Sequence, residues 1–163
     1  MLFDSAFAAA AVSITSKQRL ITAQERGIVT LPFTVTNRGT TTLTLNENIG
    51  LPNGWRILAQ RGTFILAPGE STLRLVHVLA SATVPAGRYS LPYRVTATDN
   101  LLVRAETNMT VMINATTKLA LNIIEQPQLV LAGEEYTIRV QVENKGNSAL
   151  PLTVSAKDNT GYL

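Results

Sequence analysis

The feature that most constrains the fold of this chain is an alternation of apolar and polar residues with a period of two. Residues 29–35, 89–95 and 138–142 each place Val, Leu, Ile, Phe or Tyr at every second position, with polar residues or proline between them. Successive side chains of a strand point to opposite faces, so this pattern predicts half-buried antiparallel strands. No segment keeps the spacing of an amphipathic helix for more than about two turns.

Turn sequences separate the alternating segments at the spacing of short strands. They are Asn37-Arg38-Gly39, Pro52-Asn53-Gly54, Ala67-Pro68-Gly69-Glu70, Pro85-Ala86-Gly87, Asp99-Asn100 and Asn144-Lys145-Gly146. Glycine and asparagine accept the positive φ angles of tight turns, and proline presets one turn dihedral. Many short strands with few helices predict an all-β fold, an immunoglobulin-like β-sandwich. Pro32 and Pro92 cannot donate to a sheet ladder, so we expect them at sheet edges or bulges.

An internal repeat with a constant offset divides the chain. The offset is 107 residues, the separation of Asn37 from Asn144. It relates Leu31, Phe33, Val35 and Gly39 to Ile138, Val140, Val142 and Gly146; Val12 and Ile14 to Leu119 and Leu121; Leu43 and Leu45 to Leu150 and Leu152; and Gly54-Trp55 to Gly161-Tyr162. The repeat predicts tandem sandwiches, one over residues 11–115 and a second that begins at Leu119, with residues 114–118 as the joint.

The second repeat, residues 119–163, contains counterparts of only the first half of the first. Half a sandwich exposes an apolar face and open strand edges. Three explanations are open: the chain is a fragment of a longer protein, the second half is poorly ordered, or another chain completes its strands by swapping or β-augmentation. We favour a fragment, and we expect completion by another chain, as a homodimer or by strand exchange, in any crystal.

Composition excludes several classes of function. The chain has no cysteine and one histidine, which excludes disulfides, thiolate metal sites, cysteine nucleophiles and a His-rich metal site within one chain. The net charge is +3, from 14 Lys and Arg against 11 Asp and Glu, and no two basic residues are adjacent. Nucleic-acid-binding proteins concentrate such charge on one face, so we expect no nucleic-acid partner.

The sequence contains no catalytic, cofactor-binding or metal-binding constellation. His77 is in phase with Leu73, Leu75 and Leu79 and has no Gly-x-Ser-x-Gly motif to serve, which favours a half-buried strand histidine over a catalytic base. Glu134-Glu135 follows a glycine without other carboxylates nearby, which favours a solvated turn over acid-base chemistry or calcium binding. We therefore predict a protein that is not an enzyme and has no cofactor.

Two further motifs have weak functional meaning. Asn108-Met109-Thr110 and Asn114-Ala115-Thr116 match the N-glycosylation sequon, at a frequency near chance for a chain rich in Asn and Thr. The uncharged segment Ser5–Ser16 is too short to cross a bilayer as a helix. Within it Ala6-Phe7-Ala8 fits the small-x-small pattern of signal-peptide cleavage, so these residues are either the end of an export signal or an Ala-rich leader.

Three motifs in order carry a family resemblance: Leu51-Pro52-Asn53-Gly54-Trp55, Leu66-Ala67-Pro68-Gly69-Glu70 and Val84-Pro85-Ala86-Gly87-Arg88-Tyr89. With the Asn37 turn, they make residues 27–113 resemble the β-sandwich domain found next to NPCBM modules in alpha-galactosidases and in many bacterial envelope proteins. The second repeat resembles the related bacterial CARDB domain. The resemblance implies an extracytoplasmic accessory or spacer domain of a larger chain, without shared catalytic residues.

The aromatic residues of these motifs have physical roles of their own. Trp55 starts an apolar segment after a glycine turn, which favours a plug between the sheets over an exposed sugar-stacking platform. Tyr89 follows Pro85-Ala86-Gly87, where the hydroxyl of a tyrosine corner would bond to nearby backbone.

The function that these observations favour is a non-catalytic structural or protein-interaction module of a bacterial cell-envelope or secreted protein, in the periplasm or outside the cell. One alternative is a carbohydrate-associated accessory domain of a secreted glycoside hydrolase, with carbohydrate as a weaker partner. Another is a pilus-assembly component that donates or accepts a strand, for which the alternating segment Val103–Ile113 is the candidate donor.

Overall fold

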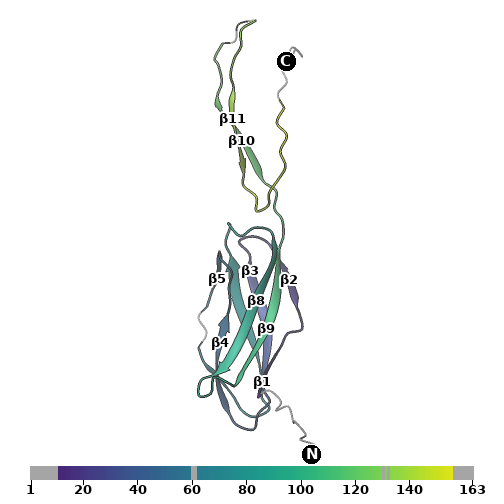
Figure 1. Cartoon of the computed structure of the whole chain (residues 1–163), viewed down its shortest axis with the longest axis vertical. Helices are drawn as coiled ribbons and strands as arrows, with labels where there is room; N and C mark the ends of the chain where they lie inside the picture. Colours follow the sequence, from purple (N-terminus) through teal and green to yellow (C-terminus); the bar gives the residue numbers. More distant parts are fainter. Residues whose placement is uncertain (1–10, 60–61, 130, 132, 156–163) are drawn as a thin grey trace, which may run out of the picture. The chain divides into compact units, whose positions relative to one another are not determined.

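The computed structural model describes residues 11–59, 62–129, 131 and 133–155. It divides into two compact units, residues 1–114 and 115–163, which we call the N-terminal and C-terminal units (Figure 1). Every regular element among the described residues is a β-strand. Ala6-Phe7-Ala8 and Gly161-Tyr162, which were singled out in the sequence, lie outside the described residues.

The N-terminal unit is an immunoglobulin-like sandwich of two sheets. The first sheet has the order β1 (Val12–Thr15), β3 (Ile28–Asn37), β7 (Ser71–Ala80) and β5 (Trp55–Ile57). The second has the order β2 (Leu20–Ala23), β9 (Arg104–Ile113), β8 (Gly87–Ala97), β4 (Leu43–Ile49) and β6 (Phe64–Leu66). All pairs are antiparallel except β2 with β9, because the chain crosses from the first sheet to the second between β1 and β2.

The core lies between the sheets, where the period-two pattern predicts it. Leu31, Phe33 and Val35 of β3 are fully buried, and so are Leu91 and Val95 of β8. Polar residues between them point to the outer faces of the sheets. The alternation therefore decides which face of each strand is removed from water.

An aromatic stack joins the two sheets at the centre of this core. The rings of Phe33 on β3 and Tyr93 on β8 are nearly parallel, with centroids 4.0 Å apart and an angle of 5° between their planes. Aromatic side chains bury large apolar areas, on the order of 150–250 Å² each, so this contact contributes heavily to holding the sheets together.

The two strand prolines are not on edge strands, so that expectation is wrong. Pro32 lies in β3 and Pro92 in β8, and both strands have a neighbour on each side. Each proline lies just beyond the end of one neighbouring ladder: the carbonyl of Pro32 accepts the Ser16 hydroxyl at 2.8 Å, and that of Pro92 accepts the Gly50 N–H at 2.8 Å. The missing N–H is tolerated because it faces a side where strand pairing has already stopped.

The described residues of the C-terminal unit contain one antiparallel hairpin, β10 (Leu119–Glu125) with β11 (Arg139–Asn144), and its register repeats that of β1 with β3. Leu119 pairs with Asn144 as Val12 pairs with Asn37. The Lys145 N–H donates to the Lys118 carbonyl at 2.7 Å, as the Arg38 N–H donates to the Ala11 carbonyl at 2.8 Å. The sequence offset thus corresponds to the same strand pairing in both units.

The Asn-x-Gly turn after each of these strands has the same hydrogen bonds. In the C-terminal unit, Asn144 Nδ2 donates to the Ser148 carbonyl and its Oδ1 accepts the Gly146 N–H. Asn37 makes the two equivalent bonds, to Thr41 and Gly39, and a third from Nδ2 to the Leu66 carbonyl at 3.0 Å. That third bond links the turn to β6, and Asn37 is fully buried where Asn144 is exposed.

We expect Asn37→Ala to lower the free energy of unfolding of the N-terminal unit by about 3 kcal/mol, because it leaves buried backbone groups without partners. Urea unfolding followed by fluorescence reports on this unit alone, because the chain has a single tryptophan, Trp55. Asn144→Ala is the matched control and should leave the tryptophan transition unchanged. Equal shifts for the two variants would contradict the role given to Asn37.

Candidate functional site

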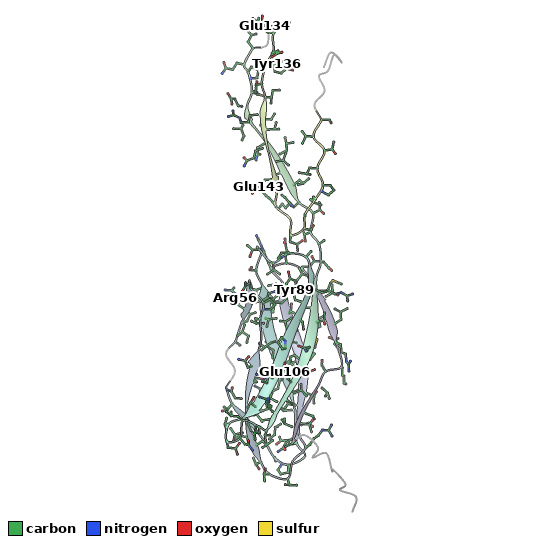
Figure 2. All side chains as sticks on the ribbon, viewed as in Figure 1. Arg56, Tyr89, Glu106, Glu134, Tyr136 and Glu143 are labelled. Carbon is green, nitrogen blue, oxygen red and sulfur yellow. The ribbon has the colours of Figure 1, made fainter. Side chains whose placement is uncertain are left out.

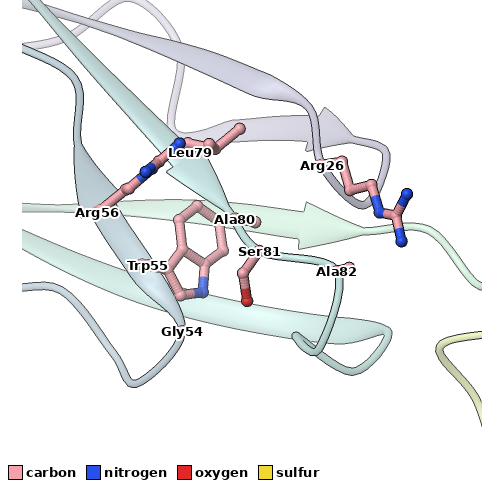
Figure 3. A pocket seen from close by; sticks show the side chains of 8 residues that line it. All are labelled: Arg26, Gly54, Trp55, Arg56, Leu79, Ala80, Ser81 and Ala82. Carbon is pink, nitrogen blue, oxygen red and sulfur yellow. The ribbon is translucent and has the colours of Figure 1, made fainter.

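A pocket of about 510 Å³ opens beside the tryptophan that the sequence singles out (Figure 3). Its lining residues come from the β2–β3 turn, from β5 and the glycine before it, and from the end of β7 with the two residues that follow: Arg26, Gly54, Trp55, Arg56, Leu79, Ala80, Ser81 and Ala82. The guanidinium groups of Arg26 and Arg56 lie on opposite sides of the indole in this view. The pocket therefore combines an apolar floor with two cationic groups at its rim.

Trp55 itself is a core plug, as predicted, and not an exposed platform. The side chain is only 8% exposed, and its ring makes a tilted contact with Tyr89, with centroids 5.4 Å apart. The indole Nε1 is buried without a hydrogen-bond partner, which costs about 1–3 kcal/mol. Burial of an area on the order of 200 Å² contributes about 5 kcal/mol. The apolar gain exceeds the polar cost, so the unpaired N–H does not require a ligand.

The tyrosine corner is confirmed. The Tyr89 hydroxyl donates to the Pro85 carbonyl at 2.7 Å, four residues upstream. This bond fixes the loop before β8 and holds the Tyr89 ring against Trp55. The role of Tyr89 is therefore structural.

The pocket lacks a nucleophile paired with a base. The Ser81 hydroxyl is hydrogen-bonded to Thr83 Oγ1 at 2.9 Å, and the other polar side chains that line the pocket are those of Arg26 and Arg56, which offer only hydrogen-bond donors. His77 is not among its lining residues. Acyl transfer or hydrolysis needs a nucleophile, a base and a group that orients the base, and this arrangement does not supply them.

His77 is half-buried in β7, as predicted, but on the outer face of the first sheet. Val76, Val78 and Ala80 fill the core positions of β7, so the residues in phase with His77, which include the exposed Leu73, point outward. Its Nδ1 is 2.9 Å from the Thr30 hydroxyl on β3. This cross-strand hydrogen bond ties the two longest strands of the sheet.

The remaining sequence candidates are on the surface. Glu134 and Glu135 are exposed in the segment that links β10 to β11, and Figure 2 shows Glu134 there. Asn108 is exposed on β9, and Asn114 follows that strand. Over the described part of the chain, no group of three His, Asp or Glu residues has the geometry to hold a metal ion. Nor does any helix in that part have the length and apolar character to span a membrane.

A charged network crosses the core, and the sequence analysis did not identify it. Arg74 of β7 binds the Glu47 carboxylate of β4 through Nη2 at 2.6 Å and Nε at 3.2 Å. The Tyr93 hydroxyl donates to the same carboxylate at 2.5 Å, and the Arg74 guanidinium lies 4.3 Å from the Phe64 ring centroid. The Glu47 side chain is only 4% exposed. A signal was present: Glu47 is in phase with the apolar Leu45 on β4, so a charge occupies a core position.

This network is structural and not an acid-base site. The hydrogen bond from Arg74 to Glu47 raises the pKa of the Arg74 guanidinium above its usual value, so folding stabilises the cation. A raised pKa contributes stability throughout the range below the ordinary arginine value and loses it only in strong alkali. The pair joins the first sheet to the second because Arg74 and Glu47 belong to different sheets.

The most unusual surface of the molecule is one face of the hairpin β10–β11, which we call the apolar hairpin face. It consists of Leu119, Leu121 and Ile123 of β10 with Val140 and Val142 of β11. Four of these side chains are between 41% and 61% exposed, and Val142 is half-buried. Their counterparts in the N-terminal unit include Phe33 and Val35, which are fully buried under the second sheet.

Solved structures that match the chain include bacterial alpha-2-macroglobulins. Salmonella alpha-2-macroglobulin reacted with methylamine matches 71% of this chain at 20% identity, with a TM-score of 0.52. The native E. coli alpha-2-macroglobulin matches 72% at 15% identity, with a TM-score of 0.52. The trypsin-activated E. coli protein matches 77% at 15% identity, with a TM-score of 0.50.

These similarities support the immunoglobulin-like fold. The chain spans only 8–9% of the length of these macroglobulin chains, so their activities are not transferred to it. No protein-family model matches the sequence, and no curated protein matches it significantly.

We expect Arg74→Met to lower the free energy of unfolding by about 3–5 kcal/mol, because it leaves a buried carboxylate without its cation. The double variant Glu47→Leu/Arg74→Met should recover most of this loss, since apolar residues can replace a buried pair. The control is the exposed pair Arg94–Glu106, with Nη2 2.6 Å from Oε2, where Glu106→Gln should cost no more than about 1 kcal/mol (Figure 2). Urea unfolding measures all three, and similar losses for Arg74→Met and Glu106→Gln would contradict a buried pair.

Proposed function

We propose that this chain is a non-catalytic structural and protein-interaction module of a larger bacterial cell-envelope or secreted protein. The N-terminal unit is the stable sandwich, and the C-terminal unit offers the apolar hairpin face to protein. The single observation that carries this proposal is that exposed face, whose counterparts in the N-terminal unit include the buried core residues Val12, Phe33 and Val35.

Energetics support a covered state for this face. An isolated two-stranded hairpin is at best marginally stable in water. Full burial of an exposed Leu, Ile or Val contributes roughly 1.5–3 kcal/mol. The five side chains are about half covered already, so covering the rest contributes on the order of 5 kcal/mol before the costs of association. A partner that covers the face therefore stabilises the hairpin as it binds.

The repeat indicates what kind of partner fits. In the N-terminal unit, the second sheet covers the equivalent face of β1 and β3, and β7 pairs with the equivalent free edge of β3. A partner with β-strands can supply the same two contacts, by packing and by β-augmentation. The chemistry of the hairpin thus favours a polypeptide over a small ligand.

An extracytoplasmic location is part of the proposal. The supporting observations are the resemblance of residues 27–113 to a bacterial envelope module and the small-x-small motif at Ala6-Phe7-Ala8. Fractionation of native cells tests it, and recovery of the chain with the cytoplasm would contradict it.

The alternatives have less support. An accessory carbohydrate domain would need an exposed aromatic platform, and Trp55 is buried. A strand donor in pilus assembly would need an unpaired strand, but β9, which spans Arg104–Ile113, already pairs with β8 and β2. Neither observation favours these functions over protein binding by the hairpin.

We expect a photo-crosslinking amino acid at Leu121 of the full chain to give protein adducts in native cells, because Leu121 lies on the apolar hairpin face. Asn122 is the matched control, since it is the next residue on β10 and points to the opposite, polar face. Mass spectrometry of the adducts should map the partner site to a β-strand. Equal adducts at both positions, or none at Leu121, would contradict the proposed function.

A further inference from the structure

Among the described residues, the edge strands of the N-terminal sandwich are short, whereas β11 pairs only with β10 and leaves a longer edge free. The edge strands β1, β2, β5 and β6 have four, four, three and three residues. The six-residue strand β11 contains no proline, lysine or bulge, while the register shift in the hairpin lies on β10 between Ile123 and Glu125. Short strands, prolines, lysines and bulges protect many edges against pairing, and β11 has none of these. The charged side chains that β11 does carry, Arg139 and Glu143, are of opposite sign.

The repeat identifies which backbone groups of β11 face its free edge. In the N-terminal unit, the Asn37 N–H donates to the Glu70 carbonyl and its own carbonyl accepts the Gly69 N–H, on the side of β7. Because Asn144 has the same register against β10, its backbone groups point away from β10. Every second residue of a strand points its N–H and C=O to the same side, so those of Val142 and Val140 also face the free edge.

We propose that the free edge of β11 pairs antiparallel with β11 of a second molecule of this chain, about a two-fold axis that lies midway between the two copies of Gln141. This proposal rests on the proposed function, because it names one partner for the same hairpin. In this register Val140 lies opposite Val142 of the second molecule, and their edge-facing N–H and C=O groups form hydrogen-bonded pairs. Gln141 lies opposite its own copy, in a pair without backbone hydrogen bonds.

Charge complementarity selects this register. Arg139 and Glu143 are two residues from the axis on either side, so each Arg139 lies opposite a Glu143 on the polar face, where Figure 2 shows the side chain of Glu143. Arg139 already binds Glu125 at 3.1 Å within the hairpin. Pairing therefore extends a row of alternating charges, Glu125, Arg139 and the second Glu143, across the joined strands.

The apolar side of the pair is equally self-complementary. A two-fold axis perpendicular to the sheet keeps both apolar hairpin faces on the same side, with β-branched Val140 beside Val142 of the second molecule. Two marginal hairpins thereby become one four-stranded sheet, a size at which β-structure becomes independently stable. The joined sheet carries a doubled apolar face, which deepens the proposed protein-binding role.

Cysteine trapping tests the register directly, because the chain has no cysteine of its own. The Cα atoms of a pair without hydrogen bonds are about 4.5 Å apart, within the range of about 4.4–6.8 Å that a disulfide spans. We expect the full chain carrying Gln141→Cys to form a disulfide-linked dimer under mild oxidation. Asn122→Cys, directly opposite Gln141 on β10 and away from the free edge of β11, is the matched control and should form no disulfide-linked dimer.

Charge reversal separates pairing from folding. Arg139→Glu should weaken self-association by about tenfold or more in sedimentation equilibrium, because it places like charges opposite each other at two positions. Arg139→Glu/Glu143→Arg should restore association. The double variant also reverses the contacts with Glu125 and Lys145 inside each hairpin, so its recovery can come only from contacts between molecules.

Three outcomes would overturn the self-pairing: a chain that stays monomeric, a dimer that Gln141→Cys does not trap, or a dimer insensitive to the charge reversal. Adducts from Leu121 to a different protein, with the purified chain monomeric, would refute the second molecule as partner while the proposed function stands. A chain that neither self-associates nor gives Leu121 adducts would refute both the self-pairing and the proposed function.

Discussion

Burial of the inward strand faces against a second layer is the constraint on which the rest of this structure depends. In the N-terminal unit, the stack of Phe33 on Tyr93 joins the two sheets, and the hydroxyl of Tyr93 extends the contact to the buried Glu47. Tyr93 thus belongs both to the apolar packing between the sheets and to the charged network. Removal of water from this layer is also what makes the Arg74–Glu47 pair strong, because the pair lies in a medium of low effective dielectric constant.

The same constraint explains why the two units differ although they repeat the same strand pairing. Asn37 and Asn144 end equivalent strands and make equivalent turn bonds, but only Asn37 reaches a second sheet, through the Leu66 carbonyl. Without that layer, the apolar hairpin face stays in water. Under the proposed function, the closed sandwich is the stable part of the chain and the hairpin is the part that association stabilises.

Sequence reasoning succeeded where one local pattern decides the outcome. Alternation placed Leu31 and Leu91 in the core, a proline-glycine turn placed the Tyr89 corner, and a glycine turn placed buried Trp55. It failed where strands distant in sequence decide. Glu47 and Arg74 are 27 residues apart, and only their positions on facing sheets make them partners. The prediction that Pro32 and Pro92 lie at sheet edges or bulges failed for the same reason. Where the ladder beside a proline ends depends on the length of the neighbouring strand, and the sequence around Pro32 does not contain that information.

The sequence by itself determined the all-β fold, the inward face of β3 and β8 and the repeat with its offset, because each follows from residue spacing along one segment. The tertiary structure alone decided that β1 and β2 belong to different sheets, that His77 points outward, and that within the described part of the chain β11 pairs only with β10. These features depend on which strands become neighbours. Neighbours are chosen by the packing of whole faces against one another, and no single segment carries that information.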